Sequence, residues 1–156
     1  MFNIHIITLG TISKPYWLNA EAEYKKRLGS YAKLKITELK EEPFSNKDNA
    51  QQVKEKEAKK LLPYIEKANI LIAMHEAGRA FDSPAFAKAL EQMSTHGDEI
   101  TFIFGGPLGF HTSILEKATM KLSLSPLTFP HQLARVVLLE QLYRAGTILA
   151  GKTYHY

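Results

Sequence analysis

The sequence contains no cysteine in its 156 residues. Disulfide bonds, thiolate metal ligands, cysteine nucleophiles and iron–sulfur clusters are therefore excluded, and a reducing compartment is the simpler expectation. Long apolar runs are also missing, since no stretch approaches the roughly 20 residues that cross a bilayer. The first residues, MFNIHIITLG, lack the basic start and the cleavage site of a signal peptide. We therefore expect a cytoplasmic protein with no membrane partner.

Two kinds of catalytic signature are absent as well. The six histidines include no pair at the i, i+4 spacing of a helical metal site, so we expect no bound metal. The nucleophile elbow Gly-x-Ser-x-Gly does not occur, so an α/β-hydrolase has no visible nucleophile. A small-molecule hydrolase or transferase is accordingly disfavoured.

The composition is that of a globular domain, with 45% hydrophobic and 23% charged residues. The length suits one domain, which we place at residues 1–156. A formal net charge of +4 favours a polyanionic partner without identifying it.

Strand-like and helix-like segments alternate along the chain. Apolar runs rich in β-branched residues predict strands at residues 2–9, 34–39, 70–74, 100–104 and 121–124. Helical patterns lie between and after them, at residues 15–31, 48–67, 83–95, 112–117 and 130–149. This alternation predicts an α/β fold, in which a mostly parallel sheet carries helices on both faces, joined by right-handed crossovers.

The last predicted helix is apolar on more than one face. One stripe is expected on the core: Ala134, Leu138, Leu142, Ala145 and Leu149. A roughly opposite face carries Leu133, Val136, Tyr143 and Thr147. We expect one sheet to bury only the first stripe, so the second predicts contact with another subunit, most simply in a homodimer.

Three segments are candidates for a functional site. FIFGGPLGF places glycines at the end of a predicted strand, where a ligand can approach the backbone, although a tight turn explains them equally well. LSLSPLTFPHQLARVV holds two prolines that stiffen a loop suited to a purine-like ligand, or simply form a helix start. The tail GKTYHY is either functional or frayed, as chain ends usually are.

These motifs, in order and spacing, resemble the bacterial ribosomal large-subunit RNA methyltransferase H family (RlmH) of the SPOUT superfamily. The resemblance begins at TLGT, includes FIFGGPLGF and LSLSPLTFPHQLARVVLLEQLYRA, and ends at the terminal Tyr-His. It implies an S-adenosylmethionine-dependent enzyme, a homodimer that methylates N3 of a pseudouridine in 23S rRNA on the assembled ribosome. It also implies a carboxyl-terminal trefoil knot, which general topology rules would not predict.

The resemblance also assigns the site residues. Cofactor contacts fall on Met74, where the family has leucine, on Gly105, and on a knot loop formed by Leu124, Ser125, Pro126, Leu127, Thr128 and Phe129. Methionine nearly conserves the volume of leucine, so adenosine binding should remain intact. Arg144, Tyr154 and His155 match family positions near the methyl-donor pocket and are expected to hold the uracil-like base. His155 is the first candidate for removing the N3 proton, with solvent as the alternative.

Contacts to RNA phosphates are expected from basic residues that cluster in the sequence: Lys25, Lys26, Arg27, Lys33 and Lys35. A solvated helix end is the alternative interpretation of this cluster. No DNA partner is expected. The competing functional class is a noncatalytic RNA-binding protein, which would show no saturable site for S-adenosylmethionine.

Overall fold

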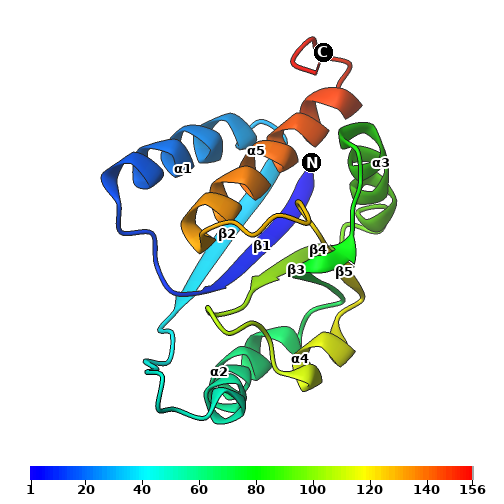
Figure 1. Cartoon of the computed structure of the whole chain (residues 1–156). Coiled ribbons are helices and arrows are strands. Elements are labelled where there is room, and N and C mark those ends of the chain that lie inside the picture. The colour runs from blue at the N-terminus through cyan, green and yellow to red at the C-terminus, as the bar shows by residue number, and fades with distance from the viewer. Residues whose placement is uncertain (156) are drawn as a thin grey trace.

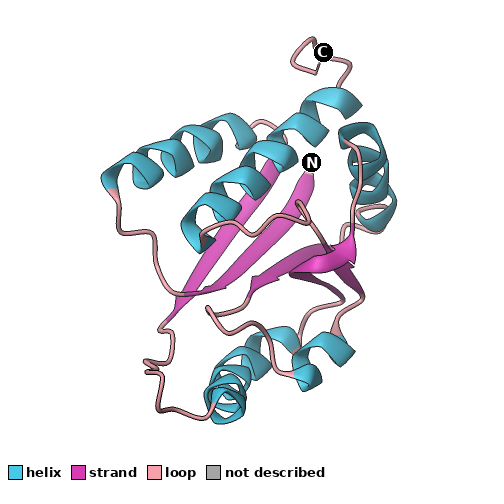
Figure 2. Ribbon diagram, in the orientation of Figure 1, coloured by secondary structure: helices cyan, strands magenta, loops and turns pink. Residues whose placement is uncertain are grey.

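A parallel sheet of five strands forms the centre of residues 1–155, the part of the chain that the computed structural model describes (Figures 1 and 2). Its strands lie in the order β2-β1-β4-β3-β5, and every neighbouring pair is parallel. The predicted fold class is therefore confirmed. The strands are β1 (Phe2–Leu9), β2 (Ala32–Leu39), β3 (Ile70–Arg79), β4 (Glu99–Phe104) and β5 (Met120–Leu122).

Helices cover both faces of this sheet, as predicted from the alternation of strands and helices. Figure 2 shows one group above the sheet and another below it. The first group is α1 (Pro15–Leu28), α3 (Ser83–Met93) and α5 (His131–Leu149), and the second is α2 (Ala50–Ile65) and α4 (Thr112–Lys117). Helices α2 and α3 begin at side-chain caps. Asn49 accepts from the amides of Gln51 and Gln52 at the start of α2, and Asp82 accepts from the amide of Ala85 at 2.7 Å at the start of α3.

Alternation along the central strands separates two hydrophobic cores. Ile4 and Ile6 of β1 pack with Phe102 of β4 under the first group of helices, whereas Ile7 and Ile103 face the second group. All five side chains are completely buried. The sheet is thus apolar on both faces, as parallel sheets are.

Helix α5 lies between α1 and α3 rather than on the outside of the fold (Figure 1). Val136 and Thr147 are buried within the chain, and Gly146 approaches Tyr31 so closely that a Cβ would lie 2.6 Å from its ring. The expectation that one sheet buries only a single stripe of this helix is therefore wrong, because α1 and α3 provide two further surfaces. Leu149, assigned to the core stripe, is 39% exposed.

Because Val136 is 7% exposed within one chain, Val136→Asp is expected to unfold the protein rather than dissociate a dimer. Burying an unpaired carboxylate should reduce the free energy of unfolding by about 3 kcal/mol. Thermal unfolding followed by circular dichroism measures this change. Leu149→Asp, at an exposed position of the same helix, is the control, and an equal melting temperature for both variants would contradict the packing described here.

The carboxyl ends of the parallel strands bring several loops together at one edge of the sheet. Gly10, with a φ of +96°, turns the chain after β1, and residues 105–110, here called the glycine loop, follow β4. Residues 123–130, here called the proline loop, connect β5 with α5. Strand β3 runs past its predicted end because Arg79 O accepts a hydrogen bond from Ser123 N at 2.9 Å.

Candidate functional site

A cavity of about 400 Å³, here called the first cavity, opens at the carboxyl end of β4 and beside the part of β3 that follows its pairing with β4. The glycine loop and the proline loop form much of its wall. Of the predicted cofactor contacts, Pro126 lies outside the lining, and the others contribute to it: Met74, Gly105, Leu124, Ser125, Leu127, Thr128 and Phe129. Residues from three separate segments of the sequence are thus brought to one cavity.

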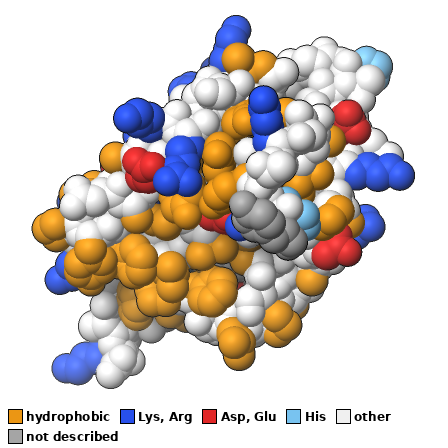
Figure 3. Space-filling model, turned by 90° about the horizontal axis from the view of Figure 1, so that it is seen from above, with side chains coloured by type: hydrophobic (Ala, Val, Ile, Leu, Met, Phe, Trp, Pro, Cys, Tyr) orange, Lys and Arg blue, Asp and Glu red, His pale blue; other side chains and the backbone are white. Residues whose placement is uncertain are grey.

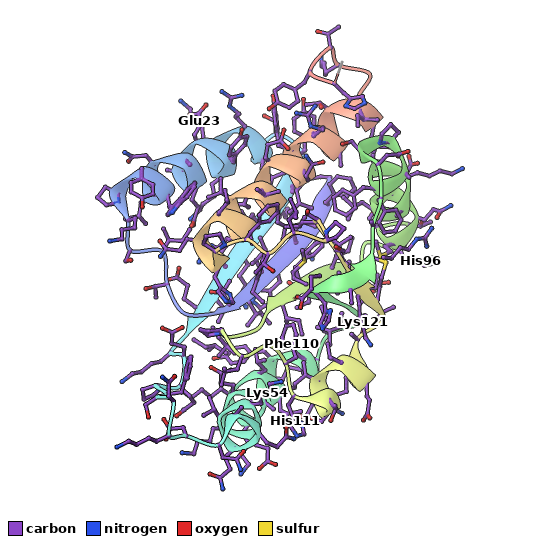
Figure 4. All side chains as sticks on the ribbon, in the orientation of Figure 1. Glu23, Lys54, His96, Phe110, His111 and Lys121 are labelled. Carbon is purple, nitrogen blue, oxygen red and sulfur yellow. The ribbon has the colours of Figure 1, made fainter. Side chains whose placement is uncertain are left out.

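Sequence reasoning did not identify several other residues that line the first cavity. Lys54 of α2 reaches it from the opposite side of the sheet from α5 (Figure 4). His75, which follows Met74 in β3, and His131, the first residue of α5, also line it. The two histidines lie close to predicted residues, which is the one sequence feature that could have pointed to them. No motif marks Lys54 as a site residue.

Close packing in the glycine loop explains two of its glycines. A Cβ on Gly105 would lie 3.3 Å from the ring of Phe110, which also lines the first cavity. Gly109 has a φ of +80°, a conformation that disfavours side chains, and its N–H donates to Gly106 O at 2.9 Å. The loop is therefore a specific turn and a cavity wall at once, so the two interpretations of FIFGGPLGF do not exclude each other.

The proline loop has its own local order. Leu127 N donates to Ser125 Oγ at 2.9 Å, and Pro130 precedes the first turn of α5, where its fixed φ is tolerated. Leu127 itself is 75% exposed although it reaches the rim of the first cavity. The trefoil knot implied by the resemblance stays a prediction.

The predicted tail residues meet one another at the far end of α5, in a group here called the tail cluster: Glu140, Arg144, Tyr154 and His155. Arg144 donates to Glu140 Oε1 through Nη2 at 2.6 Å and through Nε at 3.0 Å. Tyr154 OH donates to the same oxygen at 3.2 Å, and its ring lies 4.7 Å from the Arg144 guanidinium carbon. Arg144 Nη1 lies 3.4 Å from His155 Nδ1.

The tail cluster fixes the protonation of two of its members. Its hydrogen bonds to Glu140 raise the pKa of Arg144, which therefore stays cationic. Burial and then the charge of Glu140 raise the pKa of Tyr154 to about 12, so its phenol is a neutral donor near pH 7. Since an arginine N–H only donates, His155 Nδ1 accepts in its contact with Arg144, which places the proton of a neutral imidazole on Nε2.

Within one chain the tail cluster does not reach the first cavity. Arg144 lies ten residues beyond Ala134, the last α5 residue of the cavity wall. At about 1.5 Å per residue, this spacing is about 15 Å along the helix axis. Figure 1 shows the chain end at one end of α5 and the proline loop at the other.

A second cavity of about 620 Å³ adjoins the first, and Phe104 and His131 line both. Its wall includes the segment after β1, from Gly10 to Lys14, and the aromatic residues Tyr16 and Trp17 at the start of α1. The motif TLGT thus leads into this wall rather than into the first cavity.

The predicted basic cluster divides between two faces of the sheet. Lys25 and Arg27 pair with Glu21 and Glu23 of their own helix, at 3.4 and 2.6 Å. Ala32 and Leu34 of β2 pack on the side of α1, so the alternating Lys33 and Lys35 point to the opposite face, where both are exposed. The five residues therefore do not form one phosphate-binding patch.

Among residues 1–155, no group of three or more histidine and acidic side chains is arranged to hold a metal ion. The letters GTILAGKT at residues 146–153 fit a P-loop pattern, but their first half is the end of α5 rather than a loop after a strand. Within the same described part of the chain, no helix is both long and apolar enough to cross a membrane.

Comparison with known proteins identifies the family. The family described as "Predicted SPOUT methyltransferase" matches residues 2–155. A relative from Pelotomaculum thermopropionicum, named "Ribosomal RNA large subunit methyltransferase H", is 40% identical over 160 residues and all of both chains. A solved structure of a putative methyltransferase from Legionella pneumophila with bound SAM aligns with a TM-score of 0.49 and 18% identity, over 92% of this chain and 66% of that one. By the family match and the full-length relative, this chain belongs to the SPOUT methyltransferase family.

Proposed function

We propose that this protein transfers a methyl group from S-adenosylmethionine to N3 of a pseudouridine in large-subunit ribosomal RNA, in the cytoplasm where ribosomes assemble. The observation that carries this proposal is the first cavity, which gathers the predicted cofactor residues at the carboxyl ends of the strands. The 40% identity to a relative named for this RNA supports the choice of substrate.

The first cavity has the properties that S-adenosylmethionine requires. Its volume of about 400 Å³ falls within the range of small-molecule sites. Leu124 and Phe129 offer apolar contacts for an adenine ring, and the glycine loop leaves backbone groups open to the polar parts of the ligand. Met74, in the middle of β3 just after its pairing with β4 ends, adds a further apolar contact.

When it is bound, S-adenosylmethionine supplies a methyl group already activated by a positively charged sulfur. The chain then needs to orient the acceptor base and to stabilise the negative charge that develops as N3 loses its proton. Arg144 can donate to a carbonyl oxygen of the base, and Tyr154 remains a neutral donor beside it. His155 presents Nε2–H in the observed arrangement, so we assign it to orienting the base and assign the proton to solvent.

We propose that the active protein is a homodimer in which each tail cluster serves the first cavity of the other protomer. Support comes from the separation of about 15 Å along α5, which keeps the tail cluster away from the first cavity of its own chain, so that a second protomer is needed to bring the two together. Large hydrophobic side chains such as Tyr16 and Leu18 of α1 are exposed. Figure 3 shows hydrophobic side chains gathered on one side of the face seen from above.

Two measurements test the proposed function. Calorimetric titration with S-adenosylmethionine should give saturable binding, and labelled methyl should pass to ribosomes from a strain that lacks the corresponding enzyme. Mapping of the modified nucleotide then identifies the base. Saturable RNA binding without any binding of S-adenosylmethionine would instead support a noncatalytic RNA-binding protein.

Gly105→Val is expected to weaken S-adenosylmethionine binding by about tenfold or more. A Cβ at this position already lies 3.3 Å from the Phe110 ring, so the two additional methyl groups must displace a wall of the first cavity. Calorimetry measures the affinity, and thermal unfolding verifies that the variant is folded. Unchanged affinity in a folded variant would show that the cofactor does not bind at this loop.

A further inference from the structure

A buried carboxyl group lies behind the glycine loop, and the proposed function gives it no role. Glu57 of α2 is 3% exposed. Its Oε1 accepts a hydrogen bond from Glu42 N at 3.3 Å, whereas its buried Oε2 has no partner among residues 1–155. An unpartnered buried carboxyl oxygen is unfavourable, so its presence here calls for an explanation.

Gly106 forms the other side of this contact. A Cβ on Gly106 would lie 2.5 Å from Glu57 Oε1 and 2.6 Å from Oε2, closer than real side chains approach. The carboxyl group therefore fills the volume that a side chain at residue 106 would need. Because Gly106 lines the first cavity, Glu57 supports the wall of that cavity from behind.

The segment that holds Glu57 is itself anchored. Lys60, one turn further along α2, lies 2.5 Å from Glu42 Oε1 and donates to Lys40 O at 2.7 Å. The N–H of Glu42 is thus fixed relative to α2. Glu57 consequently joins two loops, the anchored segment after β2 and the glycine loop after β4.

The surroundings of Glu57 favour its neutral form. Burial is the main cause that raises its pKa, and the charges of Glu41 and Glu42 raise it further. The Glu42 N–H and Lys60 act in the opposite direction. A carboxyl group in this position contributes shape and hydrogen bonding more than charge, so glutamine should replace it and a shorter side chain should not.

We propose that Glu57 is a positioning residue of the cofactor site, which braces the turn at residues 105–109 in the conformation that binds S-adenosylmethionine. The role follows from its contact with Gly106 and its attachment to Glu42. Binding groups held in place by a supporting layer lose less freedom when a ligand arrives, and their affinity is correspondingly higher. Glu57 touches the turn and is not itself part of the cavity lining.

Glu57→Asp tests this role, because it shortens the side chain and withdraws the carboxyl group from Gly106. We expect S-adenosylmethionine to bind about tenfold more weakly, whereas Glu57→Gln should bind within about twofold of the wild type. Glu55→Gln, at an exposed position of the same helix, is the matched control. The Michaelis constant for ribosomes should not change, since the tail cluster is intact.

A double-mutant cycle with Gly106 distinguishes bracing from general destabilisation. Gly106→Ala alone should weaken S-adenosylmethionine binding by about tenfold, because the new Cβ collides with the Glu57 carboxyl. In Glu57→Asp/Gly106→Ala the shorter side chain leaves room for the methyl group, so the two losses should be less than additive. Strictly additive losses, or no loss in either single variant, would overturn the proposal.

This inference rests on the proposed function, in which S-adenosylmethionine occupies the first cavity. A measurement without ligand therefore tests the bracing separately. Amide hydrogen exchange at residues 105–109 should be faster in Glu57→Asp than in Glu55→Gln. If the wild-type protein binds no S-adenosylmethionine but exchange is still faster in Glu57→Asp than in Glu55→Gln, the proposed function is refuted and the bracing role is retained. Equal exchange in the two variants would refute the bracing itself.

Discussion

Arg144→Ala is expected to lower methyl transfer to ribosomes by about 100-fold, with S-adenosylmethionine affinity near that of the wild type. Arg144 is held at Nη2 and Nε by Glu140. This fixes the direction of Nη1, which carries a second N–H besides the one directed at His155. Removing the guanidinium takes away the group we assign to a carbonyl oxygen of the base. It leaves the first cavity untouched, because that cavity lies at the other end of α5.

Deletion of residues 154–156 should have an effect of similar size, since it removes both Tyr154 and His155. Tyr156, the last residue of the deletion, lies outside the described residues. Single-turnover methylation and calorimetric titration on the same preparations measure the two effects separately. Near-normal transfer by the deletion variant would mean that the tail is an inert chain end. Arg144 would then be the remaining candidate for holding the base.

Mixed dimers are expected to recover activity that neither parent variant has. A protomer carrying Gly105→Val keeps a normal tail cluster, and one carrying Arg144→Ala keeps a normal first cavity. If each tail serves the partner's cavity, a heterodimer of the two contains one intact site. Heterodimers purified through two different tags should then show about half of the wild-type activity.

The parent homodimers are the controls. Arg144→Ala should retain about 1% of wild-type transfer, and Gly105→Val about 10% or less at S-adenosylmethionine concentrations below the wild-type dissociation constant. A heterodimer no more active than its parents would mean that the first cavity and the tail cluster act within one chain. That result would contradict the composite site inferred from their separation along α5. Sedimentation of the wild-type protein as a monomer at micromolar concentration would contradict the dimer directly. The two results therefore test the composite site and the assembly independently.

Most of the fold could be predicted because its signals are local. Strand β1 and helix α4 have the predicted bounds, since glycine, proline or charged residues delimit their apolar runs. Strand β3 extends to Arg79 because its last residues pair with β5, where Gly78 comes within contact of the Leu122 backbone. That extension depends on a neighbour about 40 residues away in the sequence, and periodicity carries no information about it.

The parts of the site that are continuous segments of the sequence could be predicted. The parts that folding brings together from distant segments could not. The glycine loop and the proline loop are continuous segments, so the family resemblance located them. Lys54 and Glu57 lie on α2, where lysine and glutamate alternate without a recognisable motif. Only the folding of α2 beneath β4 brings them to the glycine loop. The same limit applies to Val136, whose burial depends on how α5 packs between α1 and α3.

The order of the strands has a consequence for how the chain folds. Each strand pair is parallel, so each requires a crossover connection. Strand β1 pairs with β4 through residues that are far apart in the sequence, such as Asn3 and Glu99. Closing such long loops before their contacts form makes folding slow for a chain of this size. The walls of the first cavity extend from Lys54 to Ala134, so a growing chain cannot hold the methyl donor until the start of α5 has been synthesised.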